Sequence, residues 1–538
     1  MPSETPSETL VRATVRTMST AHPEGSALLC RNGRVAAVGE WDQVRGLASA
    51  RAELLDLRGA TVLPGFTDSH NHMLWTGMRH GALDLSGSRS IAEIGDRLRK
   101  YAAQHPDLLW ITSSEGWFVE DLAERRMPDR EELDAYCPDV PVYLPRLGHA
   151  ASVNSRALQA AGLHAGSPDV AGGHIVRRPD GEPSGELQEA PAMRLVSRLV
   201  PEPSRREVLR ALTDVQQEYH RRGVTAVIDP ALTAPERAAY AAARDRGALT
   251  VRTTMMPVLE PDLSDDDVAG WLAGLAGPTG SGDSWLRYGA IKVFLDGVVS
   301  MGTAWVRDPY PGTCDHGTRI VAADRLALIV QECVRAGWSL GIHAIGGLAV
   351  DAALAALAAA PRTRVAGLRC SLIHAYLGPT AGNMRTAAAL GMGLAAQPQM
   401  HTWIAPRLAE MWGREVADAA SPLRSWLDAG VVVAGGSDSP LTPTDPIAGI
   451  HDAVTRLVAG RGVAGAEQRV DVATALAMYT TSAAWLAFAD HERGALVPGR
   501  LADWVALDRD PLATRPEDLR SIRVLQTRVG DRTVYDNR

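Results

Sequence analysis

The sequence predicts an α/β protein: a (β/α)8 TIM-like barrel, an inserted subdomain, and a small β-sandwich domain built from both ends of the chain. Three observations predict this fold. Short apolar strand patterns alternate with helical patterns through the middle of the chain, one long interval interrupts them, and short β patterns with turns occupy both ends. With 538 residues, 46% of them hydrophobic, the chain is long enough for one large domain and at least one smaller one.

The two ends of the chain carry the β patterns. Arg31-Asn32-Gly33 is typical of a two-residue hairpin turn, and Val529-Gly530-Asp531 marks a similar turn near the other end. Chain termini often lie close together in space. We therefore expect residues 1–63 and 491–538 to form the two parts of one small β domain.

Between these ends, residues 64–490 are expected to form the barrel. Helical patterns separate the strand patterns, and many of them end at a glycine, which suits the residue after a helix. The interval from about 80 to 220 is too long for one loop and has its own patterns, so we expect an inserted subdomain over the barrel mouth. The eight strand patterns span 60–72, 223–230, 249–258, 286–297, 338–346, 368–377, 392–399 and 430–440.

Composition excludes several classes of function. The net charge of −8 and the lack of a basic tract argue against nucleic acid as a partner. The five cysteines are far apart and form no CxxC pair, so they indicate neither a disulfide framework nor a thiolate zinc site. The most apolar stretch, 347–361, is too short for a membrane span and contains Asp351. The N-terminus has no signal-peptide pattern, and we expect a cytoplasmic protein with no membrane partner.

Unusual polar residues end the predicted strands. His70 and His72 share one face of the first strand, because alternate residues of a strand point the same way. A pair at this spacing suits either a metal site or a structural role. Each of the other strand-end residues, taken alone, also suits either a functional or a structural role. As a set, however, they predict an active site at the C-terminal ends of barrel strands. The remaining members are Lys292, His343, His374 and Asp438.

The order HxH, Lys, His, His, Asp resembles the amidohydrolase superfamily. The flanking words "PGFTDSHNH", "GHAASVNSRAL" and "GSDSPLTPTDP" resemble its N-substituted formamide deformylase-like, or YtcJ-like, branch. The resemblance extends from about residue 10 to 535.

This resemblance implies a site with two divalent metal ions, most simply Zn²⁺, since imidazole and carboxylate are good zinc ligands. His70, His72 and Asp438 would hold one ion, and His343 and His374 would hold the other. Lys292, carbamylated by CO₂, would bridge both. A metal-activated hydroxide would attack the substrate carbonyl, and Asp438 would act as general base and then as general acid.

Further residues are assigned by position. His149 matches a recurrent histidine of the branch and is expected either to donate to the substrate oxyanion or to be structural. Trp75 and Trp117 are expected to bind substrate at the mouth, with Trp305 and Trp403 nearby. Asp68 is expected to support the metal ligands or to serve as a turn residue. Glu186 and Glu189 are interpreted as loop and helix-start residues of a lid, with catalysis the less favoured meaning.

Two positions depart from the branch. Gly347 stands where an acidic residue is common, and Ile373 stands where a glutamate is usual. Neither is a metal ligand in the predicted set, so the departures affect expectations for substrate shape.

The sequence thus favours a metal-dependent hydrolase of a C–N bond in a small N-substituted amide or formamide. Hydrolysis of cyclic amides or ureas, or isomerase or decarboxylase chemistry on the same scaffold, remains an alternative. A metal-binding protein without catalysis is the third, less favoured, alternative. The expected partner is a small-molecule amide, and a homodimer is left open.

Overall fold

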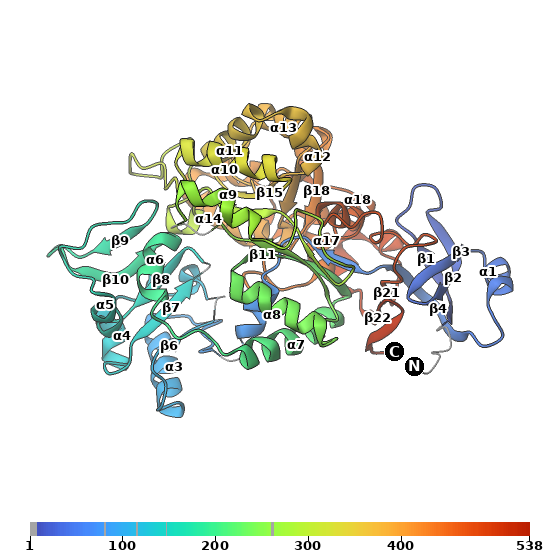
Figure 1. Cartoon of the computed structure of the whole chain (residues 1–538), viewed down its shortest axis with the longest axis horizontal. Coiled ribbons are helices and arrows are strands. Elements are labelled where there is room, and N and C mark those ends of the chain that lie inside the picture. The colour runs from blue at the N-terminus through green and yellow to red at the C-terminus, as the bar shows by residue number, and fades with distance from the viewer. Residues whose placement is uncertain (1–7, 80–81, 115–116, 147, 260–262) are drawn as a thin grey trace.

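A computed structural model describes residues 8–79, 82–114, 117–146, 148–259 and 263–538. The architecture is mixed α/β. In Figure 1 the blue N-terminal strands and the red C-terminal strands lie together at one side, and the cyan segment that carries β6 to β10 lies at the opposite side. The green to orange part between them contains the parallel sheets.

Strands from both ends of the chain share one seven-stranded sheet, in the order β23-β22-β21-β4-β1-β2-β3. Its centre joins the two ends, because β4 pairs in parallel with β1 and antiparallel with β21. Asn32 and Gly33 have φ angles of 52° and 74°, as the predicted hairpin between β2 and β3 requires. The strands are β1 (Glu8–Arg16), β2 (Glu24–Arg31), β3 (Arg34–Gly39), β4 (Glu53–Pro64), β21 (Trp504–Leu507), β22 (Val524–Val529) and β23 (Arg532–Asp536); helix α1 spans Trp41–Leu47.

The middle of the chain forms two parallel sheets, β13-β12-β11-β5 and β14-β15-β16-β17-β18. Backbone contacts join the sheets at both edges. Val258 forms a parallel bridge with Lys292, and the Ser69 amide donates to the Gly435 carbonyl over 3.0 Å. Every segment predicted as a strand contains one. The strands are β5 (Phe66–Asp68), β11 (Val224–Leu232), β12 (Arg252–Pro257), β13 (Leu286–Tyr288), β14 (Ile291–Phe294), β15 (Leu340–Ala344), β16 (Ser371–His374), β17 (Gly393–Ala396) and β18 (Val432–Gly435).

Helices alternate with these strands and bury apolar faces against them. In α10, Leu326, Ile329, Val330 and Cys333 are buried, and Gly337 ends the helix with a φ of 77°. The helices of this part are α2 (Met73–Met78), α7 (Arg205–Arg221), α8 (Ala234–Asp245), α9 (Val268–Ala273), α10 (Ala323–Ala336), α11 (Gly347–Ala359), α12 (Arg362–Leu368), α13 (Ala381–Ala389), α14 (Pro398–Trp412), α15 (Arg414–Ala419), α16 (Leu423–Asp428), α17 (Pro446–Thr455), α18 (Val472–Met478) and α19 (Thr481–Leu486). A short hairpin follows α17, with β19 (Leu457–Val458) and β20 (Gly462–Val463).

The interval between β5 and β11 contains a further five-stranded sheet, ordered β6-β7-β8-β10-β9, with its own apolar clusters. Helix α7 falls within the predicted insert but packs elsewhere, because Leu212, Val215 and Tyr219 join the main core beside β11. The elements of this sheet and its helices are α3 (Ile91–Gln104), β6 (Ile111–Thr112), α4 (Arg130–Tyr136), β7 (Val142–Arg146), β8 (Ala150–Val153), α5 (Ser155–Ala161), β9 (His174–Arg177), β10 (Pro183–Gln188) and α6 (Glu189–Ser197).

Within the described residues, none of the helices has both the length and the apolar composition needed to cross a bilayer.

Candidate active site

A cavity of about 1140 Å³ lies where the parallel strands end and the insert begins. Strand-end residues form its floor, and residues of α6, α8 and α14 contribute to its walls. Much of its wall is apolar, although Arg194, Arg198, Glu202 and Arg325 also line it. A mainly apolar wall with a few polar groups is the usual composition of a small-molecule site. The floor is formed by His70, His72, Lys292, His343, His374 and Asp438, which are all six of the predicted metal residues.

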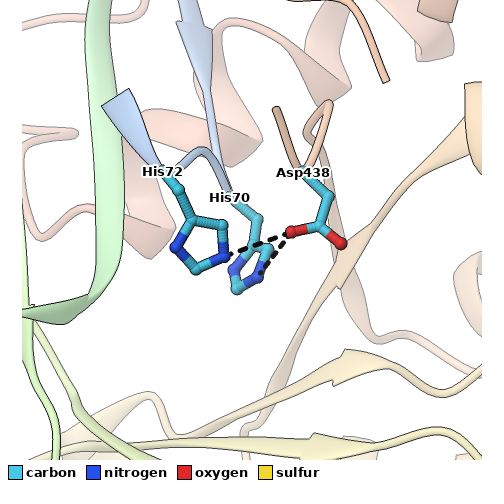
Figure 2. A group of neighbouring side chains, drawn as sticks. All are labelled: His70, His72 and Asp438. Carbon is cyan, nitrogen blue, oxygen red and sulfur yellow. Dashed lines mark ion pairs between the residues drawn. The ribbon is translucent and has the colours of Figure 1, made fainter. Parts of the chain in front are cut away.

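His70, His72 and Asp438 form the tightest cluster in this cavity. The two imidazoles follow β5, Asp438 follows β18, and Figure 2 shows both rings turned toward the same carboxylate oxygen. Nε2 of His70 lies 3.4 Å from Asp438 Oδ1, and Nε2 of His72 lies 3.3 Å from it. Ligand atoms around a tetrahedral ion are spaced roughly 3.3 Å apart when each bond is about 2.0–2.1 Å. The three side chains therefore have the spacing of a metal site, and their ligand atoms all lie within 4.8 Å of one another.

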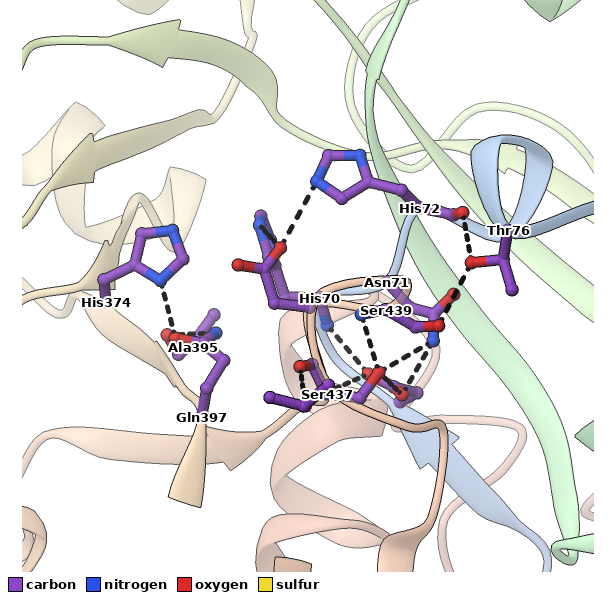
Figure 3. A network of polar contacts seen from close by, with 12 residues as sticks. His70, Asn71, His72, Thr76, His374, Ala395, Gln397, Ser437 and Ser439 are labelled. Atoms are coloured by element: carbon purple, nitrogen blue, oxygen red, sulfur yellow. Dashed lines mark hydrogen bonds and ion pairs between the residues drawn. The ribbon is translucent and has the colours of Figure 1, made fainter. Parts of the chain in front are cut away.

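A buried hydrogen-bond network holds the backbone of this cluster (Figure 3). The Asp438 amide donates to the His70 carbonyl over 2.7 Å, which ties the two ligand loops together directly. Asp68 accepts from Ser437 Oγ at 2.6 Å and from Asn71 Nδ2 at 2.9 Å. Burial raises the pKa of Asp68 to about 6, and these hydrogen bonds oppose the rise. Asp68 thus sits beneath the ligands and contacts them only through the backbone.

His343 and His374 lie beside the cluster, with ring centroids 4.7 Å apart. Nδ1 of His374 contacts the Gln397 side-chain oxygen at 2.7 Å, while the Gln397 amide donates to the Ala395 carbonyl (Figure 3). An amide oxygen only accepts, so His374 carries its proton on Nδ1 and keeps a lone pair on Nε2. His343 Nε2 points at the Gly297 carbonyl, 3.3 Å away, which leaves its Nδ1 lone pair in the same way. Both rings therefore offer one nitrogen to a ligand.

Lys292 is 1% exposed, and its side-chain nitrogen makes no hydrogen bond within the described residues. Burial lowers the pKa of its ammonium to about 7, although the nearby Asp438 carboxylate opposes this. A large fraction of the side chain is then a neutral amine at neutral pH, the form that adds to CO₂. Burial would raise the pKa of Asp438, but the His72 hydrogen bond and the charges of His374 and Lys292 hold it below its ordinary value.

The donor set fits a divalent metal centre. Nδ1 of His70 and Nδ1 of His72 are buried without a hydrogen-bond partner in the part of the chain that is described. Neither ring is therefore explained as a hydrogen-bonded core histidine. The residues gathered around the floor are the nitrogen and oxygen donors that zinc favours.

His149 comes from the insert and is held by Glu189. Its Nδ1 lies 2.8 Å from Glu189 Oε2, and its ring centroid is 5.0 Å from that of His343. Glu189 is 1% exposed, has a φ of 64°, and leaves Oε1 without a described partner. A Cβ at Gly297 would collide with that oxygen, so glycine is required there. Sequence reasoning gave Glu189 only a minor role. Nothing in the local sequence "GEPSGELQEA" (181–190) distinguishes it from Glu186, which lies on β10 away from the cavity.

The four tryptophans separate into two groups. Trp75 and Trp403 line the cavity. Trp117 does not; it is 1% exposed, donates to the Pro145 carbonyl over 2.9 Å, and packs in the core of the insert. Trp305 packs against the main core with the Arg319 guanidinium over its ring. Its position in the sequence led us to expect Trp117 near the cavity mouth, but its large apolar ring packs in the core of the insert instead.

The structure also explains the two positions that depart from the branch, Gly347 and Ile373. A Cβ at Gly347 would lie 2.8 Å from both Arg307 Nε and the Gly378 carbonyl, so no larger residue fits there. Arg307 instead pairs with Asp351 one turn along α11. Ile373 packs in an apolar cluster with Met256, and both residues line a small cavity that also reaches His70. Both positions lie outside the six-residue set.

Comparisons with known proteins agree with this geometry. The sequence model of the amidohydrolase family matches residues 53–535. The N-substituted formamide deformylase of Arthrobacter pascens is 30% identical over 538 residues, covering 98% of each chain. YtcJ of Bacillus subtilis, whose name describes an amidohydrolase, is 29% identical, with 95% of this chain and 96% of YtcJ covered. A crystal structure of an uncharacterized metal-dependent hydrolase from Pyrococcus horikoshii OT3 aligns with a TM-score of 0.75 at 24% identity, covering 95% of this chain and 99% of its own.

Fold and site together define a metal-dependent hydrolase. The chain belongs to the amidohydrolase family, as the resemblance in its sequence predicted, and is an enzyme that acts on C–N bonds other than peptide bonds.

Proposed function

We propose that this protein hydrolyses a small N-substituted amide or formamide to an acid and an amine. The observation that carries the proposal is the convergence of four histidines, Lys292 and Asp438 on the floor of one cavity. The 30% identity to a protein named N-substituted formamide deformylase supports this substrate class. The apolar part of the wall suits an apolar substituent on the amide nitrogen.

The proposal extends to the scaffold. We propose that the two parallel sheets close into a single (β/α)8 barrel, supported by the backbone contacts at both of their edges. Residues 1–63 and 491–538 are proposed to form one small β domain, and residues from about 80 onward an inserted subdomain.

The metal centre is proposed to hold two ions, with zinc favoured by the donor set. His70, His72 and Asp438 would hold one, His343 and His374 the other, and Lys292 would bridge them as a carbamate. Bound divalent ions supply a water of lowered pKa and polarise the substrate carbonyl. Lysine as an ammonium cannot ligate a metal, so the proposal requires the modified side chain.

The side chains around the centre move the protons and orient the substrate. Burial opposes ionisation of Asp438, but the contact with His72 holds its pKa below the ordinary value. As a carboxylate it would accept a proton from the attacking water and pass it to the leaving amine. His149 would donate from Nε2 to the developing oxyanion as a doubly protonated imidazolium, because its Nδ1–H already donates to the Glu189 carboxylate. Trp75 and Trp403 line the wall that would receive the amide substituent.

The test is amine release from a panel of N-substituted formamides, acetamides, and cyclic amides and ureas, measured with a fluorescent amine reagent. We expect turnover of an acyclic amide that Asp438→Asn reduces by at least about 10³-fold. If only the cyclic amides or ureas were converted, the substrate class would be cyclic amides or ureas and not acyclic amides. No release from any compound by the metal-loaded protein would overturn the proposed function.

A further inference from the structure

Trp75 has an unusual position for a residue of a substrate-binding wall. Its ring lies face to face with the His72 imidazole, with centroids 4.2 Å apart and an angle of 3° between the planes. Helix α2 begins directly after His72, so residue 75 lies almost one turn along and its side chain leans back over residue 72. The stack follows from this local geometry.

The His72 ring contacts Asp438 through Nε2, but within the described residues it has no second hydrogen bond, at Nδ1, that would fix the plane of the ring. Its backbone is held, since its amide donates to the Ser439 carbonyl over 2.9 Å and its carbonyl accepts from Thr76. Its Nδ1 is buried, however, and lacks a hydrogen-bond partner within the described residues. Metal-binding histidines usually donate their second nitrogen to a neighbouring acceptor, which sets the ring orientation. Such an acceptor is present for His374 and not for His72.

Trp75 is in turn held by a different part of the fold. Its indole Nε1 donates to Glu236 Oε1 over 3.1 Å. The other oxygen of Glu236 accepts from the Thr233 amide and hydroxyl, both at 2.7 Å, and so caps the start of α8. The hydrogen bond to Glu236 therefore fixes the indole nitrogen at the start of α8, and the face of the ring stacks on the His72 imidazole.

We infer that Trp75 is the positioning residue of the metal ligand His72, and that Glu236 holds it in place. The stack replaces the hydrogen bond that His72 lacks and keeps Nε2 directed at Asp438, 3.3 Å away. An aromatic contact of this kind restricts rotation of the ring while leaving both of its nitrogens free. This inference rests on the proposed metal site but not on the proposed substrate.

The test measures metal retention, and needs no substrate. Full-length zinc-loaded protein is challenged with a chromophoric chelator, and His72→Ala identifies which phase of zinc release belongs to the ion at His70, His72 and Asp438. We expect Trp75→Leu to speed that phase by about 10- to 100-fold, the usual effect of removing an outer support of a ligand. Trp75→Phe, which retains an aromatic face, should give a smaller effect. The change in tryptophan fluorescence on zinc release should be smaller in both variants.

Matched variants separate positioning from stability. Glu236→Ala should speed the same phase, whereas Thr233→Ala weakens the same helix cap without touching the indole and should not. Trp403→Leu removes another tryptophan of the cavity that has no ring contact with His72, and should retain zinc as the wild type does. Thermal unfolding reports whether each variant is folded; if Trp75→Leu is not, Trp75→Phe and Glu236→Ala decide.

Two results would overturn the inference. Zinc release unchanged in the folded Trp75 and Glu236 variants would show that the stack has no positioning role. A wild-type protein that binds no zinc at this cluster would remove the metal site itself, and the inference with it. Failure of the amide panel alone would leave the zinc measurement intact, so the two proposals fail separately.

Discussion

At the scale of single residues, Lys292 has the most unusual environment. It is buried among apolar strand residues, its Nζ lies 4.6 Å from the Phe294 ring centroid, and burial lowers its pKa to about 7. We expect Lys292→Ala to lose most of the second metal ion and nearly all activity, with short carboxylic acids partly restoring both. Elemental analysis and ¹³C-bicarbonate NMR are the measurements. An unmodified lysine in active, metal-loaded enzyme would refute the bridging role.

The buried pair of His149 and Glu189 gives the second prediction at this scale. Glu189→Ala frees the imidazole to rotate, so kcat should fall by about 10²-fold with KM little changed, since the hydrogen bond to the oxyanion forms in the transition state. Glu189→Gln retains an acceptor and should recover part of the loss. Glu186→Gln, on neighbouring β10 and outside the cavity, is the control. Equal losses in kcat and in stability for Glu189→Gln would indicate a structural role instead.

At the scale of elements, α7 is held to three strands by His220. Nδ1 lies 3.2 Å from the Val224 carbonyl, Nε2 lies 2.9 Å from Thr250 Oγ, and the His220 carbonyl accepts from Thr527 at 2.7 Å. These contacts connect the helix to β11, to the start of β12 and to β22. The imidazole and the carbonyl of His220 together join the parallel sheet to the C-terminal strands.

This contact makes stability depend on pH. Burial lowers the pKa of His220 to about 4, while the unfolded chain has a value near 6.5. Between these values only the unfolded state binds the proton, so the stability from His220 is complete above pH 6.5 and falls by up to about 3 kcal/mol as the pH drops to 4. We expect His220→Gln to flatten this part of the dependence of Tm on pH. Parallel curves for the variant and the wild type between pH 4 and 6.5 would contradict this.

At the scale of the whole molecule, the two ends of the chain stabilise each other. β4 lies between β1 and β21, with Leu63 paired to Val505. Deleting residues 495–538 exposes one edge of β4 and should lower the hydrogen-exchange protection of β4 and β1 together. Exchange followed by mass spectrometry gives the measurement. Full protection of residues 10–60 in the truncated protein would show that the N-terminal strands stand alone.

The metal content is also a property of the whole molecule, because the proposed ligands come from five strands and the loops that follow them. We expect close to two divalent ions per chain, most of them zinc, and loss of activity on chelation with recovery on adding zinc. Inductively coupled plasma mass spectrometry of the protein before and after chelation is the measurement. Full activity in a sample stripped of metal would contradict the prediction.

The sequence by itself determined where the strands lie and which residues gather at the candidate metal site. Period-two and continuous apolar patterns place strands where the structure has them, and the turns at Asn32-Gly33 and Gly530-Asp531 adopt the positive φ values that those residues favour. Each residue of the candidate metal site lies within a parallel strand or in the loop that follows one, and the C-terminal ends of such strands meet at one side of the sheet. The residues are His70, His72, Lys292, His343, His374 and Asp438.

Only the tertiary structure decided which other side chains join this site. Glu189 and Glu186 look alike in the sequence, yet only Glu189 meets His149, because a left-handed backbone turns it inward. Trp117 was expected at the cavity and lies in the insert core, while Trp75 stacks on His72 and reaches Glu236, 161 positions away. The periodic spacing of apolar residues in the sequence indicates which face of a helix or strand is buried. It carries no information on what a buried side chain contacts, since those partners come from distant segments that meet only after folding.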